Sequence, residues 1–168
     1  MAMTISQALR RIKKLKGELA VHLARAASSN TFKGNEEPAF RFGPMMELAS
    51  SARSELISLE TQVARTNAQT FISYPAGKVT LTEATKVLRE LKSQLSWFEG
   101  LPSREHEKTT SKETEYNEDD KRVSREVVYT CDLPVAKKAA EVTRLQAQFD
   151  ALNDAVETAN HRTELISS

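Results

Sequence analysis

The stretch "VAKKAAEVTRLQAQFDALNDAVETAN", residues 135–160, decides the fold class of this chain. Its apolar residues recur at steps of three and four, which is the period of an amphipathic helix and of a coiled-coil seam. These residues are Val135, Ala139, Val142, Leu145, Phe149, Leu152 and Val156. We therefore predict one long helix over residues 133–160, close to 40 Å in length at roughly 1.5 Å per residue.

Three earlier segments have the same helical period. Two of them begin with a capping box, in which a threonine and a residue three positions later satisfy each other's backbone N–H groups. Thr4 with Gln7 forms the first box, and Thr80 with Glu83 forms the second. We predict these three helices over residues 5–27, 44–70 and 81–99.

The segment ahead of the last helix has a different character. Its first half is polar and rich in threonine, "NEDDK" resembles a turn, and "RVSREVVYTC" is β-branched and aromatic. This order predicts a β-hairpin over residues 107–131, with strands near 107–116 and 122–131. Residues 28–43 read as a loop, and "FISYPAGKVTL", residues 71–81, reads as a short connection.

These elements predict a mainly α fold, an antiparallel helical bundle of long helices with one projecting β-hairpin, within a single helical domain over residues 1–168. The apolar seams are thin, with mostly one apolar residue per turn and alanine at several positions. Because such helices need more partners than one small chain supplies, we expect a homo-oligomer.

Composition limits the partners and the compartment. The formal net charge is +1, so the chain as a whole does not have the charge of a protein that binds nucleic acid polymers. The single cysteine, Cys131, leaves no intrachain disulfide framework and fits a reducing compartment. No stretch approaches the roughly 18 to 20 apolar residues that cross a bilayer. The charged, periodic start has no secretory pattern. We expect a cytoplasmic protein with no membrane partner.

Three segments together resemble the septicolysin-like family of small bacterial and phage-associated proteins of unknown activity. They are "VARTNAQT" (63–70), "VTLTEATKVLRELKSQL" (79–95) and "NDAVETANHRTELI" (153–166). The resemblance covers residues 4–166 and implies the same order of helices and hairpin. His161 stands where family members often carry an aromatic residue, so the ligand's identity cannot be carried over.

A polar site is predicted where two apolar seams stop. Asn67 and Asn160 each occupy the position at which the next apolar seam residue is due. A buried amide is costly unless it is hydrogen-bonded, so each asparagine is either a cap or register device or part of a ligand pocket. The neighbouring cations and hydroxyls suit a small anionic or nucleotide-like molecule, and Tyr74 could stack a flat ring. The candidate ligand-binding residues are Arg65, Thr66, Asn67, Thr70, Tyr74, Asn160, His161, Arg162 and Thr163.

The predicted first helix also has a strongly basic face. Six cations of this helix face a single acid, Glu18. The sets that could converge on one ligand are Arg10, Lys13 and Lys14, or Lys14 and Arg25. The alternative is a solvated face that is balanced by glutamates of neighbouring helices.

Motifs for catalysis are missing from the sequence. His22, His106 and His161 lack the spacing of metal ligands, and there is no HExxH, GxSxG, P-loop or GxGxxG pattern. Since no nucleophile, base and orienting group can be assembled, we expect no enzyme activity, no metal and no cofactor.

The sequence leaves three functions to weigh. The first is a non-catalytic homo-oligomeric binding protein with inter-subunit polar pockets, which in a phage setting could sequester an immune signalling nucleotide. The second is a structural or assembly protein without a ligand. The third is a membrane-active cytolysin, which is what the name of the resembling family implies.

Overall fold

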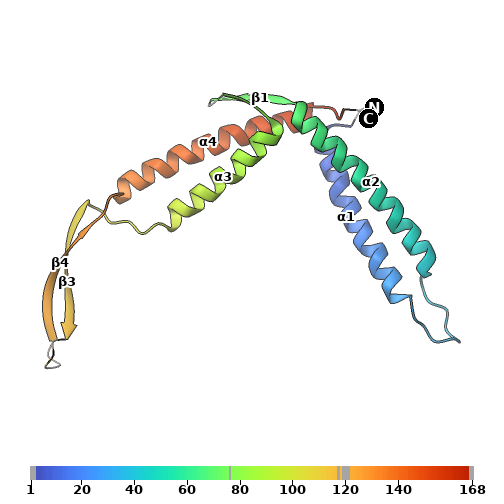
Figure 1. Cartoon of the computed structure of the whole chain (residues 1–168), viewed down its shortest axis with the longest axis horizontal. Helices are drawn as coiled ribbons and strands as arrows, with labels where there is room; N and C mark the ends of the chain where they lie inside the picture. Colours follow the sequence, from blue (N-terminus) through green and yellow to red (C-terminus); the bar gives the residue numbers. More distant parts are fainter. Residues whose placement is uncertain (1–2, 76, 117, 119–121, 167–168) are drawn as a thin grey trace. The chain divides into compact units, whose positions relative to one another are not determined.

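The computed structural model describes residues 3–75, 77–116, 118 and 122–166. The described chain is mainly α, with four long helices packed in pairs and two small antiparallel hairpins (Figure 1). The helices are α1 (Ile5–Ser28), α2 (Phe42–Gln69), α3 (Leu81–Gly100) and α4 (Val135–Arg162). The strands are β1 (Phe71–Tyr74), β2 (Gly77–Thr80), β3 (Lys108–Tyr116) and β4 (Arg122–Thr130). The predicted fold class is confirmed, and each predicted helix lies within about two residues of the observed one.

The chain divides into two compact units, which are described in turn. Unit 1 comprises Met1–Thr85 and Asp154–Ser168, and unit 2 comprises Lys86–Asn153. Helices α3 and α4 contribute residues to both units.

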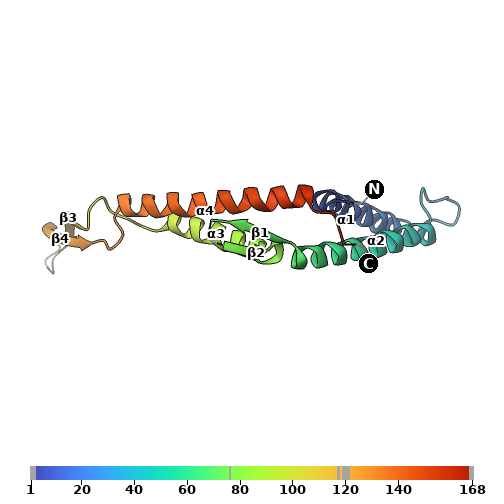
Figure 2. The same cartoon turned by 90° about the horizontal axis from the view of Figure 1, so that it is seen from above.

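Unit 1 is built on the pairing of α1 with α2, which lie side by side in Figures 1 and 2. Helix α1 begins at the predicted capping box, where Thr4 Oγ1 accepts from the Gln7 N–H at 3.3 Å and Gln7 Oε1 accepts from the Thr4 N–H at 2.9 Å. Outside the seam, the Arg11 guanidinium donates two hydrogen bonds of 2.7 Å to the Glu55 carboxylate. The seam buries Ile5, Ala8, Ile12, Leu15 and Ala26 of α1 against Ala49, Ala52, Leu56, Leu59, Val63 and Thr66 of α2.

The seam differs from the sequence prediction in two places. The steps of three and four along residues 5–27 predict Leu9 and Leu23 inside the seam, but these side chains are 44% and 36% exposed. Asn67 was expected to end the seam of α2, yet the fully buried residue there is Thr66, and Asn67 is half-buried. The reason is helical geometry: buried positions alternate steps of three and four, and the step of four from Leu59 to Val63 is followed by one of three.

A second hairpin in unit 1 replaces the predicted short connection. Strands β1 and β2 pair antiparallel from Phe71↔Thr80 to Tyr74↔Gly77. Gly77 has a φ of 142°, a conformation that L side chains rarely adopt, so glycine suits this turn. Ile72 is buried, and the Leu81 N–H donates to the Thr70 carbonyl at 2.9 Å, which joins the hairpin to the start of α3.

The segment after α4 closes unit 1. The Ile5 N–H donates to the Thr163 carbonyl at 3.0 Å, and the Leu165 N–H donates to the Met3 carbonyl at 2.8 Å. The Ile166 N–H then donates to Thr66 Oγ1 at 3.1 Å. These bonds hold the end of α4 next to the start of α1 and the end of α2.

Unit 2 contains the rest of α3 and α4, which lie side by side in both views, and the β3–β4 hairpin. Leu91, Leu95, Leu145 and Leu152 are buried in it. The hairpin pairs from Lys108↔Thr130 to Tyr116↔Arg122, so its predicted strands are correct to within one residue.

Candidate functional site

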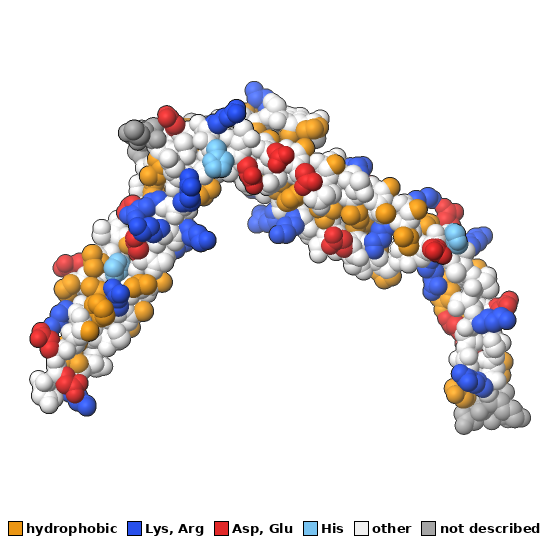
Figure 3. Space-filling view, turned by 180° about the vertical axis from the view of Figure 1, so that it is seen from behind, with side chains coloured by type: hydrophobic (Ala, Val, Ile, Leu, Met, Phe, Trp, Pro, Cys, Tyr) orange, Lys and Arg blue, Asp and Glu red, His pale blue; other side chains and the backbone are white. Residues whose placement is uncertain are grey.

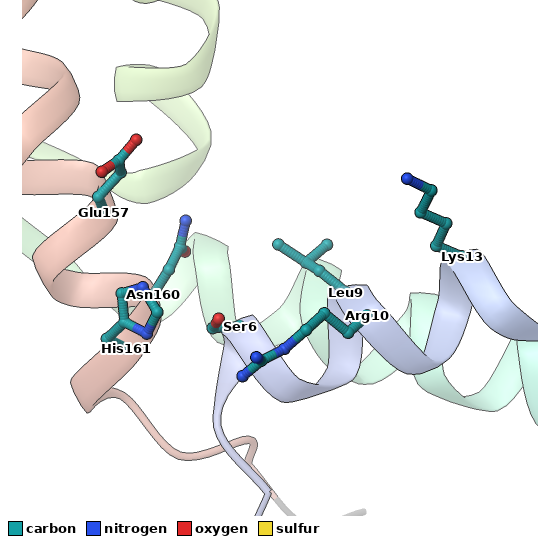
Figure 4. A pocket seen from close by; sticks show the side chains of 7 residues that line it. All are labelled: Ser6, Leu9, Arg10, Lys13, Glu157, Asn160 and His161. Carbon is teal, nitrogen blue, oxygen red and sulfur yellow. The ribbon is translucent and has the colours of Figure 1, made fainter.

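A polar pocket of about 470 Å³ lies in unit 1, where the first turns of α1 meet the last turns of α4 (Figure 4). Two walls form it, because α1 presents side chains at i, i+3, i+4 and i+7 and α4 presents side chains at i, i+3 and i+4. The lining residues are Ser6, Leu9, Arg10 and Lys13 from α1 and Glu157, Asn160 and His161 from α4. The backbone bonds of Ile5 with Thr163 and of Leu165 with Met3 fix these two walls next to each other.

The α1 wall supplies the positive charge. Other cations of this helix are occupied, since Arg11 pairs with Glu55 and Lys16 pairs with Glu60 at 2.8 Å. Within the part of the chain that the structure describes, Arg10 and Lys13 have no such ion pair. In Figure 4 the Arg10 side chain extends from α1 toward the end of α4. The pocket therefore offers two exposed cations to an anionic group.

The α4 wall supplies groups that donate and accept hydrogen bonds. Asn160 is half-buried and His161 is exposed. The Asn160 amide has two donor hydrogens and one acceptor oxygen, and the Glu157 carboxylate is an acceptor. Figure 4 shows Asn160 pointing into the space beside α1. A ligand held here would need both anionic groups for α1 and hydroxyl or amino donors for α4.

The structure separates the predicted site residues into two groups. Asn160 and His161 line the pocket, but Asn67 is not among its lining residues. Asn67 is half-buried on α2, and its Oδ1 is buried without a hydrogen-bond partner among the described residues. The pocket is thus built from the end of α4 and the start of α1, and the two asparagines do not line it together.

The remaining candidates have local structural roles or face solvent. Thr66 is fully buried, and its hydroxyl donates to the Gln62 carbonyl at 2.8 Å while accepting from the Ile166 N–H. Thr70 and Thr163 follow the last turns of α2 and α4, where each N–H donates to the carbonyl four residues earlier. Arg65 and Arg162 are exposed, and Tyr74 is half-buried on β1.

Sequence reasoning missed part of the pocket. Arg10 and Lys13 belong to the basic face of the predicted first helix, so their charge was visible, but their neighbour was not. No sequence pattern identified Glu157, Ser6 or Leu9 as pocket residues. The backbone pairing of residues 3–5 with residues 163–165 brings these two ends of the sequence together.

The structure adds three observations on other chemistry. Among the described residues, no group of three or more His, Cys, Asp or Glu side chains could hold a metal ion. The half-buried Cys131 thiol accepts from the Arg104 N–H at 3.4 Å and donates to the Leu133 carbonyl at 3.3 Å, so it joins the hairpin base to the start of α4. In the described chain, no helix is long and apolar enough to cross a membrane.

The fold and the pocket define a class: a mainly α protein of paired long helices and two hairpins, with a polar pocket in unit 1. No family model and no curated protein matches the chain. The chain is similar to the crystal structure of a functionally unknown conserved protein from Corynebacterium diphtheriae, at 16% identity and a TM-score of 0.72. The match covers 99% of this chain and 100% of the other. At this identity the likeness shows a shared fold alone.

Proposed function

We propose that this chain is a non-catalytic binding protein that acts as a homo-oligomer and holds a small anionic, nucleotide-like ligand in the α1–α4 pocket. The observation that carries the proposal is the pair Arg10 and Lys13, which have no ion pair among the described residues and stand beside Asn160 and His161. The volume of about 470 Å³ is within the range of small-molecule sites, roughly 300 to 1,000 Å³.

The chemistry of the lining favours a nucleotide-like molecule over a simple anion. Arg10 and Lys13 suit phosphate oxygens, since both donate charge-assisted hydrogen bonds. Glu157 would repel a bare anion but accepts hydrogen bonds from sugar hydroxyls. Asn160 can donate and accept at the edge of a base. A phosphate at one end and hydroxyls at the other would satisfy both walls.

Exposed apolar side chains on the α1–α2 pair support the homo-oligomer. Two paired helices have only one shared seam, and additional apolar side chains remain at the surface over this pair (Figure 3). They are Leu9, Val21, Leu23, Leu48 and Ile57, which are 36–58% exposed. Leu9 also lines the pocket. A second subunit packed over Leu9 would therefore enclose the ligand, which is the reason to place the pocket at a subunit interface.

In this proposal the ligand is held and not chemically changed. In a phage setting, such binding would sequester a host immune signalling nucleotide. Membership of the septicolysin-like family is proposed on the same terms, from the segments that carry the resemblance.

Native mass spectrometry of the purified oligomer tests the proposal first, because a bound nucleotide adds its mass to the complex. Calorimetric titration with ADP-ribose, cyclic dinucleotides, adenine nucleotides and inorganic phosphate then identifies the class. Arg10→Gln is expected to weaken binding at least about tenfold, the equivalent of 1.4 kcal/mol. Lys14→Gln is the matched control, since Lys14 is 69% exposed, pairs with Glu18 and does not line the pocket. Equal affinities for the two variants, or no bound or titrated ligand at all, would end the proposal.

A structural or assembly protein without a ligand is the second candidate. The exposed apolar side chains of α1 and α2 favour it, since they account for assembly alone. In that case Asn160→Ala would change the stability or the mass of the oligomer and would abolish no binding.

A membrane-active cytolysin, the function implied by the family name, makes a separate prediction. Such a protein would release dye from liposomes, and the control variant Leu9→Lys would release none at the same concentration. We expect no release from either protein.

A further inference from the structure

The β3–β4 hairpin of unit 2 leaves both of its edges unpaired among the described residues. Each strand has nine residues, and the two form a two-stranded sheet on their own. In both views the hairpin lies beyond the ends of α3 and α4 (Figures 1 and 2). A two-stranded ribbon is marginally stable in water, and its outer N–H and C=O groups are a template for another strand.

The ladder determines which backbone groups face outward on β4. The Cys131 N–H donates to the Glu107 carbonyl at 2.7 Å, which makes Glu107 and Cys131 a hydrogen-bonded pair in the register of the hairpin. Such pairs alternate with non-hydrogen-bonded pairs along an antiparallel ladder. The outward-facing N–H and C=O groups of β4 therefore belong to the even-numbered residues. These are Arg122, Ser124, Glu126, Val128 and Thr130.

The two edges differ in how well they resist pairing. The outward positions of β3 include Lys108 and Lys112, and lysine is a common protection of an edge strand. Strand β4 contains no lysine, proline or glycine; its charged outward residues are Arg122 and Glu126, and its Val128 is 61% exposed. The β4 edge is the one suited to accept a strand.

We propose that β4 pairs antiparallel with β4 of a second copy of this chain, centred on Val127, so that two hairpins make a four-stranded sheet. Charge excludes two neighbouring registers. Centring on Glu126 would oppose two carboxylates, and centring on Arg125 would oppose two guanidinium groups. Centring on Val127 opposes two valines at the middle and places residues 124–130 of both copies in register with no like charges opposite each other.

The side-chain pairing in this register is also favourable. Arg125 lies opposite Tyr129 of the other copy, and the small residues Ser124 and Thr130 oppose each other. Val127 and Tyr129 are already half-buried within one hairpin, on the face that the central pair would extend. The inference rests on the homo-oligomer of the proposed function, and it does not depend on the α1–α4 pocket.

A cysteine cross-link tests the register directly. Around Val127 the two strands would form a non-hydrogen-bonded pair, in which Cα atoms are about 4.5 Å apart, within the reach of a disulfide. In a Cys131→Ser background, Val127→Cys is expected to form a covalent dimer on mild oxidation, seen by non-reducing electrophoresis. Ser111→Cys is the matched control, since Ser111 is the in-register neighbour on β3 and would lie two strands further from its copy. Equal cross-linking of both variants, or of neither, would overturn the register.

A pair of proline variants tests the edge independently of the cross-link. Val128→Pro removes an outward N–H of β4, and Thr110→Pro removes the corresponding outward N–H of its partner on β3. Light scattering is expected to give a lower mass for Val128→Pro than for Thr110→Pro and the unmodified chain. If the unmodified chain is an oligomer whose mass neither proline changes, the β4 interface is wrong and the proposed oligomer stands. If the unmodified chain is a monomer, the β4 interface and the proposed homo-oligomer are both wrong.

Discussion

Thr66 joins the end of α2 to the segment after α4, and its hydroxyl is the group to remove. The side chain is fully buried, donates to the Gln62 carbonyl at 2.8 Å and accepts from the Ile166 N–H at 3.1 Å. Thr66→Val keeps the shape and removes both bonds. The Gln62 carbonyl retains its helical partner, so the main loss is the bond to Ile166.

The size of the effect follows from what Ile166 loses. One intramolecular hydrogen bond contributes about 1 kcal/mol, and an unsatisfied N–H costs about 1 to 3 kcal/mol more when water is excluded. Ile166 is 39% exposed, so water can reach this region and the lower values apply. The extra methyl group of valine gains apolar burial and offsets part of the loss. We expect the free energy of unfolding to fall by about 1 kcal/mol.

Thr61→Val is the matched control for this substitution. Thr61 is exposed on the same helix, and its hydroxyl donates to the Ile57 carbonyl at 2.8 Å. Among the described residues it accepts no bond from a distant residue, so its replacement should change stability by less than about 0.5 kcal/mol. Urea denaturation measures both differences, and amide hydrogen exchange at Ile166 measures the local one.

Hydrogen exchange gives the decisive result. Thr66→Val should accelerate exchange at Ile166, because the N–H loses its acceptor, and Thr61→Val should not. If Ile166 exchanges equally in both variants, the Thr66 hydroxyl does not hold the segment after α4, and the account of how this end of unit 1 closes is wrong.

Three further outcomes follow from the contacts of the two units. Leu15 is 1% exposed, so Leu15→Ala should lower the free energy of unfolding by about 2 to 5 kcal/mol in a denaturant titration. Leu23 is 36% exposed, so Leu23→Ala should lower it by less than about 1 kcal/mol. Equal losses would contradict the seam between α1 and α2. The hydrogen bond from Arg11 lowers the pKa of Glu55 from 4.5, so the pair stabilises the fold above that value and the contribution is lost as pH falls through the folded pKa. The Tm difference between the unmodified chain and Glu55→Gln should therefore be small at neutral pH and disappear in acid. Lys138 Nζ donates to the Leu101 carbonyl at 2.7 Å and to the Glu99 carbonyl at 3.0 Å, at the end of α3. Lys138→Met should therefore lower the free energy of unfolding by about 1 kcal/mol. An unchanged urea midpoint would show that these capping bonds do not stabilise the fold.

Local rules predicted the elements well. The steps of three and four around Leu56 and Leu152 repeat the turn of a helix, and the helices they predict are present. The capping box of Thr4 and Gln7 joins groups only three residues apart, so it could be predicted from the sequence without knowledge of the fold. The β1–β2 hairpin was missed because its strands have four residues each, too short for alternation to separate them from a connection.

The candidate site was less predictable, and its residues show why. Asn160 and His161 were identified because an apolar pattern stopped there. Arg10 and Lys13 were seen as a basic face with no known neighbour. No local rule links residue 10 with residue 160, since their proximity depends on the path of the whole chain.

The amino-acid sequence by itself determined the mainly α class, the bounds of four helices and the larger hairpin, because helix and strand periods are properties of the local backbone. Only the tertiary structure decided that the end of α4 meets the start of α1, and that Thr66 accepts a hydrogen bond from a residue 100 positions away. The physical reason is that periodicity specifies which face of a helix is buried, whereas the identity of the partner depends on contacts that many amphipathic faces could make.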